Sequence, residues 1–75
     1  MEELLNYILK KITANPKDVK VEKEEENNEV KFLISINEED KGRVIGKNGS
    51  NIKSIRLILS ILAKREDKKV YLKVQ

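Results

Sequence analysis

The spacing of the apolar residues changes several times along this chain, and this change constrains the fold more than any other feature. Near the N-terminus, apolar residues recur three and four positions apart, which is the spacing of one buried helix face. They are Leu5, Ile8, Leu9 and Ile12. Pro16 ends this helix, because the residue before a proline avoids helical backbone angles.

A second long helix is expected from Ser50 to about Arg65, where apolar residues again recur at helical spacing. Its stripe consists of Ile52, Ile55, Leu59 and Leu62, with Ile58 and Ala63 at the edges. A shorter helix is expected over residues 38–45, because Asn37 is a suitable N-cap and three acidic residues follow it directly.

Three other segments alternate with the period of two that is typical of a β-strand. They are the pair Val19 and Val21, the run from Val30 to Ile36, and the run from Val70 to Val74. Residues 22–29 contain five Glu, one Lys and two Asn, and we interpret them as a connection. The order α-β-β-α-α-β predicts one α+β domain over residues 1–75, with a three-stranded mixed sheet packed against helices.

The composition excludes several classes of site. The chain has no cysteine and no histidine, so it has no disulfide, no thiolate nucleophile and neither of the commonest metal ligands. No apolar run approaches the roughly 18 residues of a membrane span. The first residues, Met1 to Glu3, are acidic where a signal peptide would be basic. We therefore expect a soluble cytoplasmic protein without metal or cofactor.

Positive charge is concentrated in the second half of the chain. Residues 1–37 carry six Lys and eight Asp or Glu, a net −2, whereas residues 38–75 carry ten Lys or Arg and five Asp or Glu, a net +5. Seven basic residues and no acidic residue lie between Lys41 and Arg65. This segment would attract a polyanion, although a solvated face of a lysine-rich protein would have the same composition.

The segment Gly46-Lys47-Asn48-Gly49 separates the short helix from the second long helix. A glycine at each end allows a tight turn and a close approach of another backbone. The first amides of the following helix are expected to be unpaired at the positive end of the helix dipole, an arrangement that binds phosphate. A Walker A loop is a poor alternative, because Gly42 and Gly46 are separated by only three residues and Asn48 follows the lysine.

The run from Val44 to Ile52, Val-Ile-Gly-Lys-Asn-Gly-Ser-Asn-Ile, resembles the signature of the KH domain. An extra helix and strand before the core resemble the type II arrangement of this domain. The resemblance extends over nearly the whole chain to the small stand-alone bacterial KH proteins of the KhpA family. It implies a non-catalytic protein that binds single-stranded RNA and acts as an RNA chaperone or post-transcriptional regulator.

The resemblance also implies roles for individual residues. Gly46, Lys47, Asn48 and Gly49 would clamp the RNA backbone, and Ile45 and Ile52 would line an apolar groove for the bases. Three nearby cations, Arg43, Lys53 and Arg56, could add phosphate contacts, although the KH signature does not fix them. Tyr7 and Tyr71 could stack on bases, but we favour a position at the edges of the helices and the sheet for both.

Leu57 and Ile61 support a second hypothesis, in which the chain is mainly a protein-interaction subunit. At 100° per residue they point away from the buried stripe of their helix, where a surface helix should be polar. They would form a dimer face, either with a second copy or with a larger KH-containing protein.

An enzyme is a poor alternative, because consecutive carboxylates at Glu38, Glu39 and Asp40 do not converge on one point.

Overall fold

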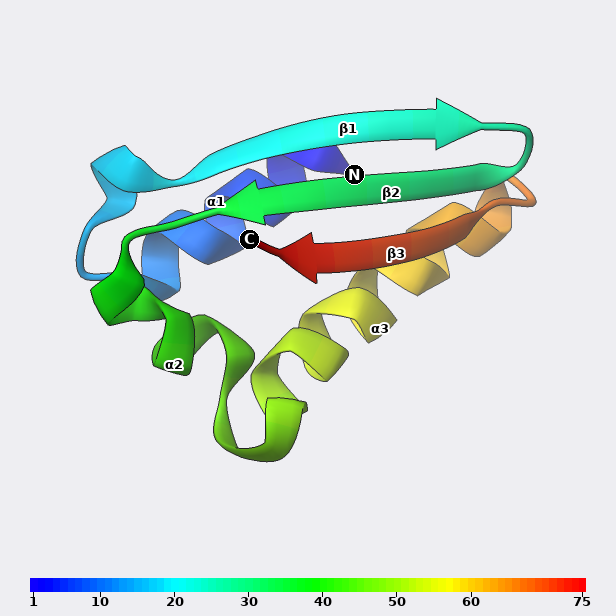
Figure 1. Cartoon of the computed structure of the whole chain (residues 1–75). Helices are drawn as coiled ribbons and strands as arrows, with labels where there is room; N and C mark the ends of the chain where they lie inside the picture. Colours follow the sequence, from blue (N-terminus) through cyan, green and yellow to red (C-terminus); the bar gives the residue numbers. More distant parts are fainter.

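A computed structural model describes all 75 residues of the chain. Three strands form one sheet in the order β1-β2-β3, with β1 at Lys20–Glu26, β2 at Glu29–Ser35 and β3 at Lys69–Val74. The helices are α1 at Glu2–Ile12, α2 at Lys41–Ile45 and α3 at Ser50–Arg65 (Figure 1). The predicted α+β order and the predicted bounds of the second long helix are confirmed.

The sheet is mixed, as predicted. The strands β1 and β2 form an antiparallel hairpin, whereas β2 and β3 are parallel. Parallel neighbours need a crossover connection, and here the chain crosses through α2 and α3. Because β1 and β2 occupy the other positions in the sheet, one edge of β3 remains unpaired.

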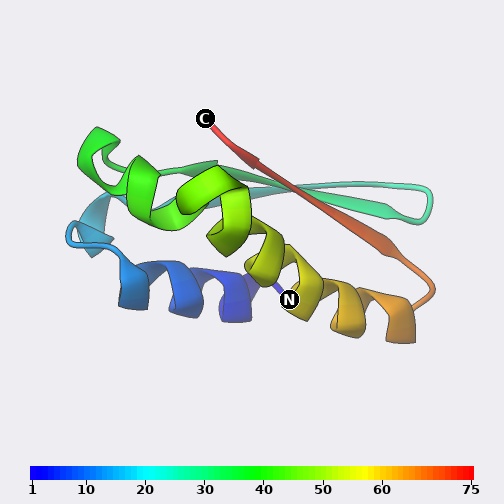
Figure 2. The ribbon, with the colours of Figure 1, turned by 90° about the horizontal axis from the view of Figure 1, so that it is seen from below.

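Both long helices lie on the same side of the sheet, as Figure 2 shows with the sheet seen nearly edge-on. The core lies between these two layers, and no helix covers the opposite face of the sheet. The fully or almost fully buried apolar residues are Leu5, Leu9, Val19, Val30, Phe32, Ile34, Val44, Ile55, Leu59, Ala63 and Val70. Ala63 is thus part of the core rather than its edge, whereas Ile58 is 45% exposed.

The acidic segment after Val21 was wrongly interpreted as a connection. Residues Glu22 to Glu26 belong to β1, and only Asn27 and Asn28 form the turn of the hairpin. This strand is at the edge of the sheet, and its residues after Val21 are all exposed. Its charged side chains therefore remain in water while its backbone pairs with β2, and charged side chains on an edge strand also discourage pairing with other chains.

Asp40 connects the N-terminal helix to the start of α2. Its carboxylate is buried and accepts hydrogen bonds from the backbone amides of Ala14 (2.9 Å) and Asn15 (3.0 Å). These bonds, led by the one from Ala14, hold the pKa of Asp40 below its ordinary value. Asn37 caps the turn before α2 as predicted, because its side chain accepts a hydrogen bond from the amide of Glu39 at 2.9 Å.

No helix of the structure is long and apolar enough to cross a lipid bilayer.

Candidate nucleic-acid interface

The loop from Gly46 to Gly49 projects away from the sheet between α2 and α3 (Figure 1). Its backbone uses left-handed angles at both glycines, with φ of 77° at Gly46 and 76° at Gly49. Asn48 is also left-handed, with φ of 55°, and asparagine tolerates this region better than most residues. The side chains of Lys47 and Asn48 are exposed at the tip.

Gly46 is required for a reason beyond its own backbone angle. A Cβ at this position would lie 2.6 Å from the side chain of Asn51 and 2.8 Å from its backbone nitrogen. Asn51 sits so close because its side-chain amide donates a 2.7 Å hydrogen bond to the carbonyl of Arg43, at the end of α2. Asn51 therefore ties the two helices together across the loop, a role that the sequence analysis did not foresee.

Two amides at the start of α3 form hydrogen bonds within the turn, although the sequence predicts unpaired amides there. The amide of Gly49 donates to the carbonyl of Gly46 at 3.1 Å, and the amide of Ser50 donates to Lys47. These two donors are used inside the turn and are not available to a phosphate. The start of α3 nevertheless carries no acidic residue and no side-chain cap, so the positive end of its dipole is not neutralised.

An open cavity of about 260 Å³ lies beside the loop, between α3 and the free edge of β3. It is lined by Ile52, Lys53 and Arg56 of α3 and by Leu72 of β3. The structure thus brings together three of the residues that the sequence analysis selected. Leu72 was expected only as a strand residue, and its place in this cavity depends on β3 being an edge strand.

The four loop residues do not line this cavity, and neither do two other predicted site residues. Ile45 is half-buried at the end of α2 and is not among the lining residues. Arg43 is exposed on α2, and its positive charge contributes to the low pKa of Asp40. A contact of either residue with RNA stays a prediction.

The three consecutive carboxylates before α2 do not form a metal site. Asp40 points inward to the amides after α1, whereas Glu38 pairs with Lys41 at 2.7 Å on the surface. Nowhere in the chain do three acidic side chains converge in a way that could hold a metal ion.

The predicted dimer face on α3 is exposed. The exposed fractions of Leu57 and Ile61 are 66% and 59%, and the neighbouring Ile58 adds to the same apolar surface. These three residues, called the α3 patch below, lie outside the core. Whether another chain covers them stays a prediction.

Comparison with known proteins identifies the family. Residues 2–74 match the family model described as the KhpA/KhpB KH domain. The RNA-binding protein KhpA of Thermotoga maritima is 42% identical over 74 residues, which cover 99% of this chain and 97% of that protein. The RNA-binding protein KhpA of Listeria monocytogenes is 38% identical with the same coverage. The RNA-binding protein KhpA of Chlamydia trachomatis is 34% identical and is covered over 95% of its length.

No solved structure matches the chain. The family is not an enzyme family, which agrees with the prediction of a non-catalytic protein. The match covers nearly all of the chain, from the first residue of α1 to the last residue of β3. The chain therefore belongs to the KhpA/KhpB family of KH-domain proteins.

Proposed function

We propose that this protein binds single-stranded RNA, with the phosphate backbone at the Gly46–Gly49 loop and the bases in the cavity between α3 and β3. The observation that carries the proposal is that the loop with the exposed Lys47 leads directly into α3, whose first two turns line a cavity with both apolar and basic side chains. Membership of the family supports it, as do the names of the relatives, which are RNA-binding proteins.

The chemistry of the site favours a single strand over a duplex. Ile52 and Leu72 offer apolar surface to a base, and Lys53 and Arg56 offer charge to the phosphates beside it. A base can reach that apolar surface only when it is not already stacked and paired inside a duplex. The chain has only three aromatic residues, so its affinity should depend mainly on phosphate contacts and on this groove.

A single small groove of this kind binds about four nucleotides and should therefore bind weakly and with little sequence selectivity. Weak binding to many RNAs suits an RNA chaperone or a post-transcriptional regulator better than a receptor for one RNA. We extend the proposal to that role and to a location in the cytoplasm.

The loop can be tested by reversing its charge. Lys47→Asp with Asn48→Asp places two carboxylates where a phosphate must sit, and Asp also tolerates the left-handed angle of Asn48. Affinity for a short strand of about four nucleotides should fall at least tenfold, which corresponds to about 1.4 kcal/mol. Fluorescence anisotropy with labelled RNA measures the change.

The chain offers a matched control. Lys17→Asp with Asn27→Asp makes the same change in net charge at exposed positions, and Asn27 shares the left-handed angle, with φ of 54°. Both residues lie away from the loop, so affinity for the short strand should change less than threefold, or about 0.65 kcal/mol. An equal loss in both variants would show that only the net charge matters and would overturn the proposed site.

The α3 patch supports a second candidate function. A chain of this length has a small core, and three large apolar side chains exposed on one helix are available to pack against another protein. We propose that a second copy of this chain occupies the patch, with a larger KH-containing protein as the alternative partner. In this case RNA binding would be secondary to assembly.

A further inference from the structure

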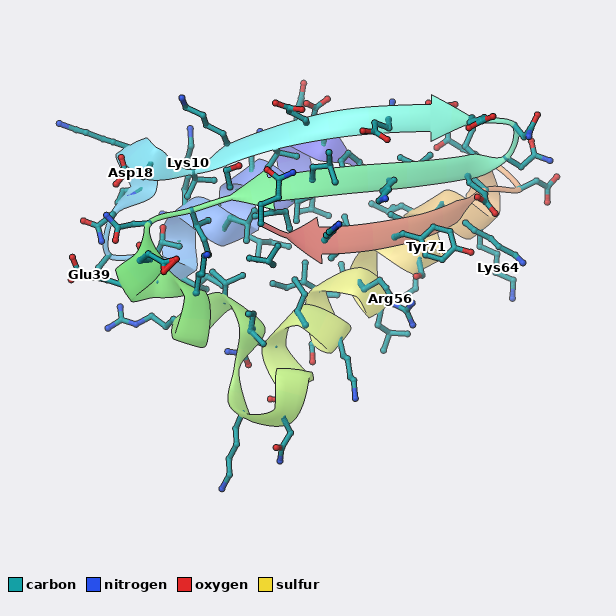
Figure 3. The ribbon with its side chains drawn as sticks, viewed as in Figure 1. Lys10, Asp18, Glu39, Arg56, Lys64 and Tyr71 are labelled. Atoms are coloured by element: carbon teal, nitrogen blue, oxygen red, sulfur yellow. The ribbon has the colours of Figure 1, made fainter.

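A second open cavity adjoins the first one along α3. Its volume is about 320 Å³, and it is lined mainly by Arg56, Ser60 and Lys64 of α3 and by Lys69, Val70 and Tyr71 at the start of β3. Arg56 lines both cavities, so the two form one continuous groove between α3 and β3. Figure 3 shows the side chains of Arg56, Lys64 and Tyr71 close to one another along this groove.

Three cations of this second cavity are not neutralised. Lys68, which also borders it, donates a 2.6 Å hydrogen bond to Glu25, and this bond raises the pKa of Lys68. In contrast, Arg56, Lys64 and Lys69 take part in no ion pair. Several unpaired positive charges around one groove raise the local concentration of a polyanion.

The free edge of β3 supplies hydrogen-bonding groups to both cavities. The amides of Lys69 and Gln75 donate to carbonyls of the β2 side, at Asn28 and Ile34, each at 2.8 Å. Backbone groups alternate between the two edges of a strand, so those of Val70 and Leu72 point to the unpaired edge. One of these residues lines each cavity, where its N–H and C=O could meet the edge of an unpaired base.

Tyr71 lies partway along the groove, between Arg56 and Lys64 (Figure 3). It is 40% exposed and offers a ring on which a base could stack, a use beyond the position at the edge of the sheet that the sequence favours. On its other side, over the open face of the sheet, Tyr71 borders a cavity lined by one cation, Lys31, and by four carboxylates, Glu24, Glu25, Glu26 and Glu29. These carboxylates repel a nucleic acid and would keep a strand on the α3–β3 edge.

From this arrangement we propose that the same RNA strand continues from the cavity beside the loop into the second cavity, toward Lys64 and Lys69, with one of its bases stacked on Tyr71. This inference rests on the proposed function. Arg56 and Lys64 are eight residues apart on a helix, or about 12 Å. That length accommodates roughly three further nucleotides at the 3.4 Å spacing of a stacked strand. The protein therefore binds a strand nearly twice as long as the four-nucleotide groove alone.

The test compares strands of about four and about eight nucleotides in the wild type and in Lys64→Gln with Lys69→Gln. The variant should bind the long strand more weakly, and its slope of log K against log salt should become shallower by about 1.4 for two lost phosphate contacts. Binding of the short strand and its slope should remain as in the wild type. Lys17→Gln with Lys20→Gln removes the same charge at exposed positions outside the groove and should affect neither strand.

Tyr71 is tested separately. Tyr71→Ala should weaken binding of the long strand roughly five- to hundredfold, the range of one lost base–aromatic stack, and should leave the short strand unaffected. Tyr71→Phe keeps the ring and should retain the affinity of the wild type for both strands. Far-UV circular dichroism confirms that each variant is folded.

The outcomes separate this inference from the proposed function. If the wild type binds neither strand, or if the loop variant at Lys47 and Asn48 keeps its affinity for the short strand, the proposed function fails. The proposed function holds if the loop variant no longer binds the short strand. If, in addition, the variant at Lys64 and Lys69 binds both strands equally more weakly than the wild type, or binds both as tightly, the second cavity is not part of the RNA path.

Discussion

The three glycines around the loop allow a stability experiment that tests the site geometry directly. Gly42 lies inside α2, and a Cβ there would have no atom within 4 Å. Replacing it with alanine should stabilise the protein by about 0.5–1 kcal/mol, because glycine loses more backbone entropy in a helix than alanine does. Gly49→Ala puts a side chain into left-handed backbone at a cost of about 1–2 kcal/mol, with only ordinary contacts at 3.9 Å.

Gly46→Ala should be the most damaging of the three. Its angles, φ of 77° and ψ of 174°, fall in a region that only glycine occupies readily, and the strain is about 1–3 kcal/mol. The new Cβ would also lie 2.8 Å from the backbone nitrogen of Asn51, which cannot rotate away. Displacing Asn51 breaks its hydrogen bond to Arg43, worth about 0.5–1.5 kcal/mol. The total is roughly 2–4 kcal/mol.

Urea unfolding followed by circular dichroism gives the free energy of unfolding of all three variants, and thermal melts give their Tm. For a domain of this size a loss of 2–4 kcal/mol lowers Tm by at least about 8 °C. The expected order of stability is Gly42→Ala, wild type, Gly49→Ala and then Gly46→Ala. If Gly46→Ala were as stable as Gly49→Ala, the close approach of Asn51 to the loop would be wrong, and so would the loop geometry on which the RNA site is built.

Three further predictions concern acid, assembly and salt. The carboxylate of Asp40 stabilises the fold at pH values above 3.8, the ordinary pKa of this group. This stabilisation is lost as the pH falls through the lower pKa that Asp40 has in the folded protein. Asp40→Asn should therefore melt earlier at neutral pH but lose less stability than the wild type on acidification, as measured by thermal melts across pH. Ile61→Gln should convert a dimer into a folded monomer, as measured by sedimentation equilibrium. A wild type that is monomeric at tens of micromolar would refute dimerisation through the α3 patch. If the short strand contacts two or three phosphates, its log K should fall with log salt at a slope of about −1.4 to −2.1, and a salt-independent affinity would contradict the phosphate contacts.

The fold was predictable wherever burial determines the spacing of apolar residues in the sequence. The helical stripes and the alternation in β2 and β3 arise because one face of each element packs against the core, so the sequence records them. The order of the elements followed from these patterns. Asn37 was recognisable as a cap because capping is a local interaction between a side chain and the next few amides.

Only the start of strand β1, at Val21, was predicted, and the rest of the strand was missed because its residues after Val21 are all exposed. Glutamate is depleted in strands, and the run from Glu24 to Glu26 gives no apolar alternation. The strand forms because β2 offers an edge to pair with and the short Asn27–Asn28 turn brings the chain back onto it. Such pairing depends on tertiary context, which a local sequence pattern does not contain.

Within the candidate site, the residues of the loop and the first turns of α3 were predictable because they are close together in the sequence. Asn51 was not, because its role depends on a carbonyl eight positions earlier that only the folded loop brings within 2.7 Å. Arg56 was selected as one of several nearby cations, but its place where two cavities meet depends on a strand that starts 13 residues after it.

The edge position of β3 decides whether a groove exists at all. If β3 lay between β1 and β2, the backbone groups of Val70 and Leu72 would be paired inside the sheet, and α3 would face no free edge. The sequence predicts a strand at this place but not its neighbours, because the alternation of Val70, Leu72 and Val74 would suit an edge strand or a central one. Parallel pairing with β2 alone leaves the other edge open beside the basic side of α3. The RNA path proposed above therefore follows from the order of the strands as much as from the glycine loop, and a variant that pairs or blocks this edge should abolish binding even with an intact loop.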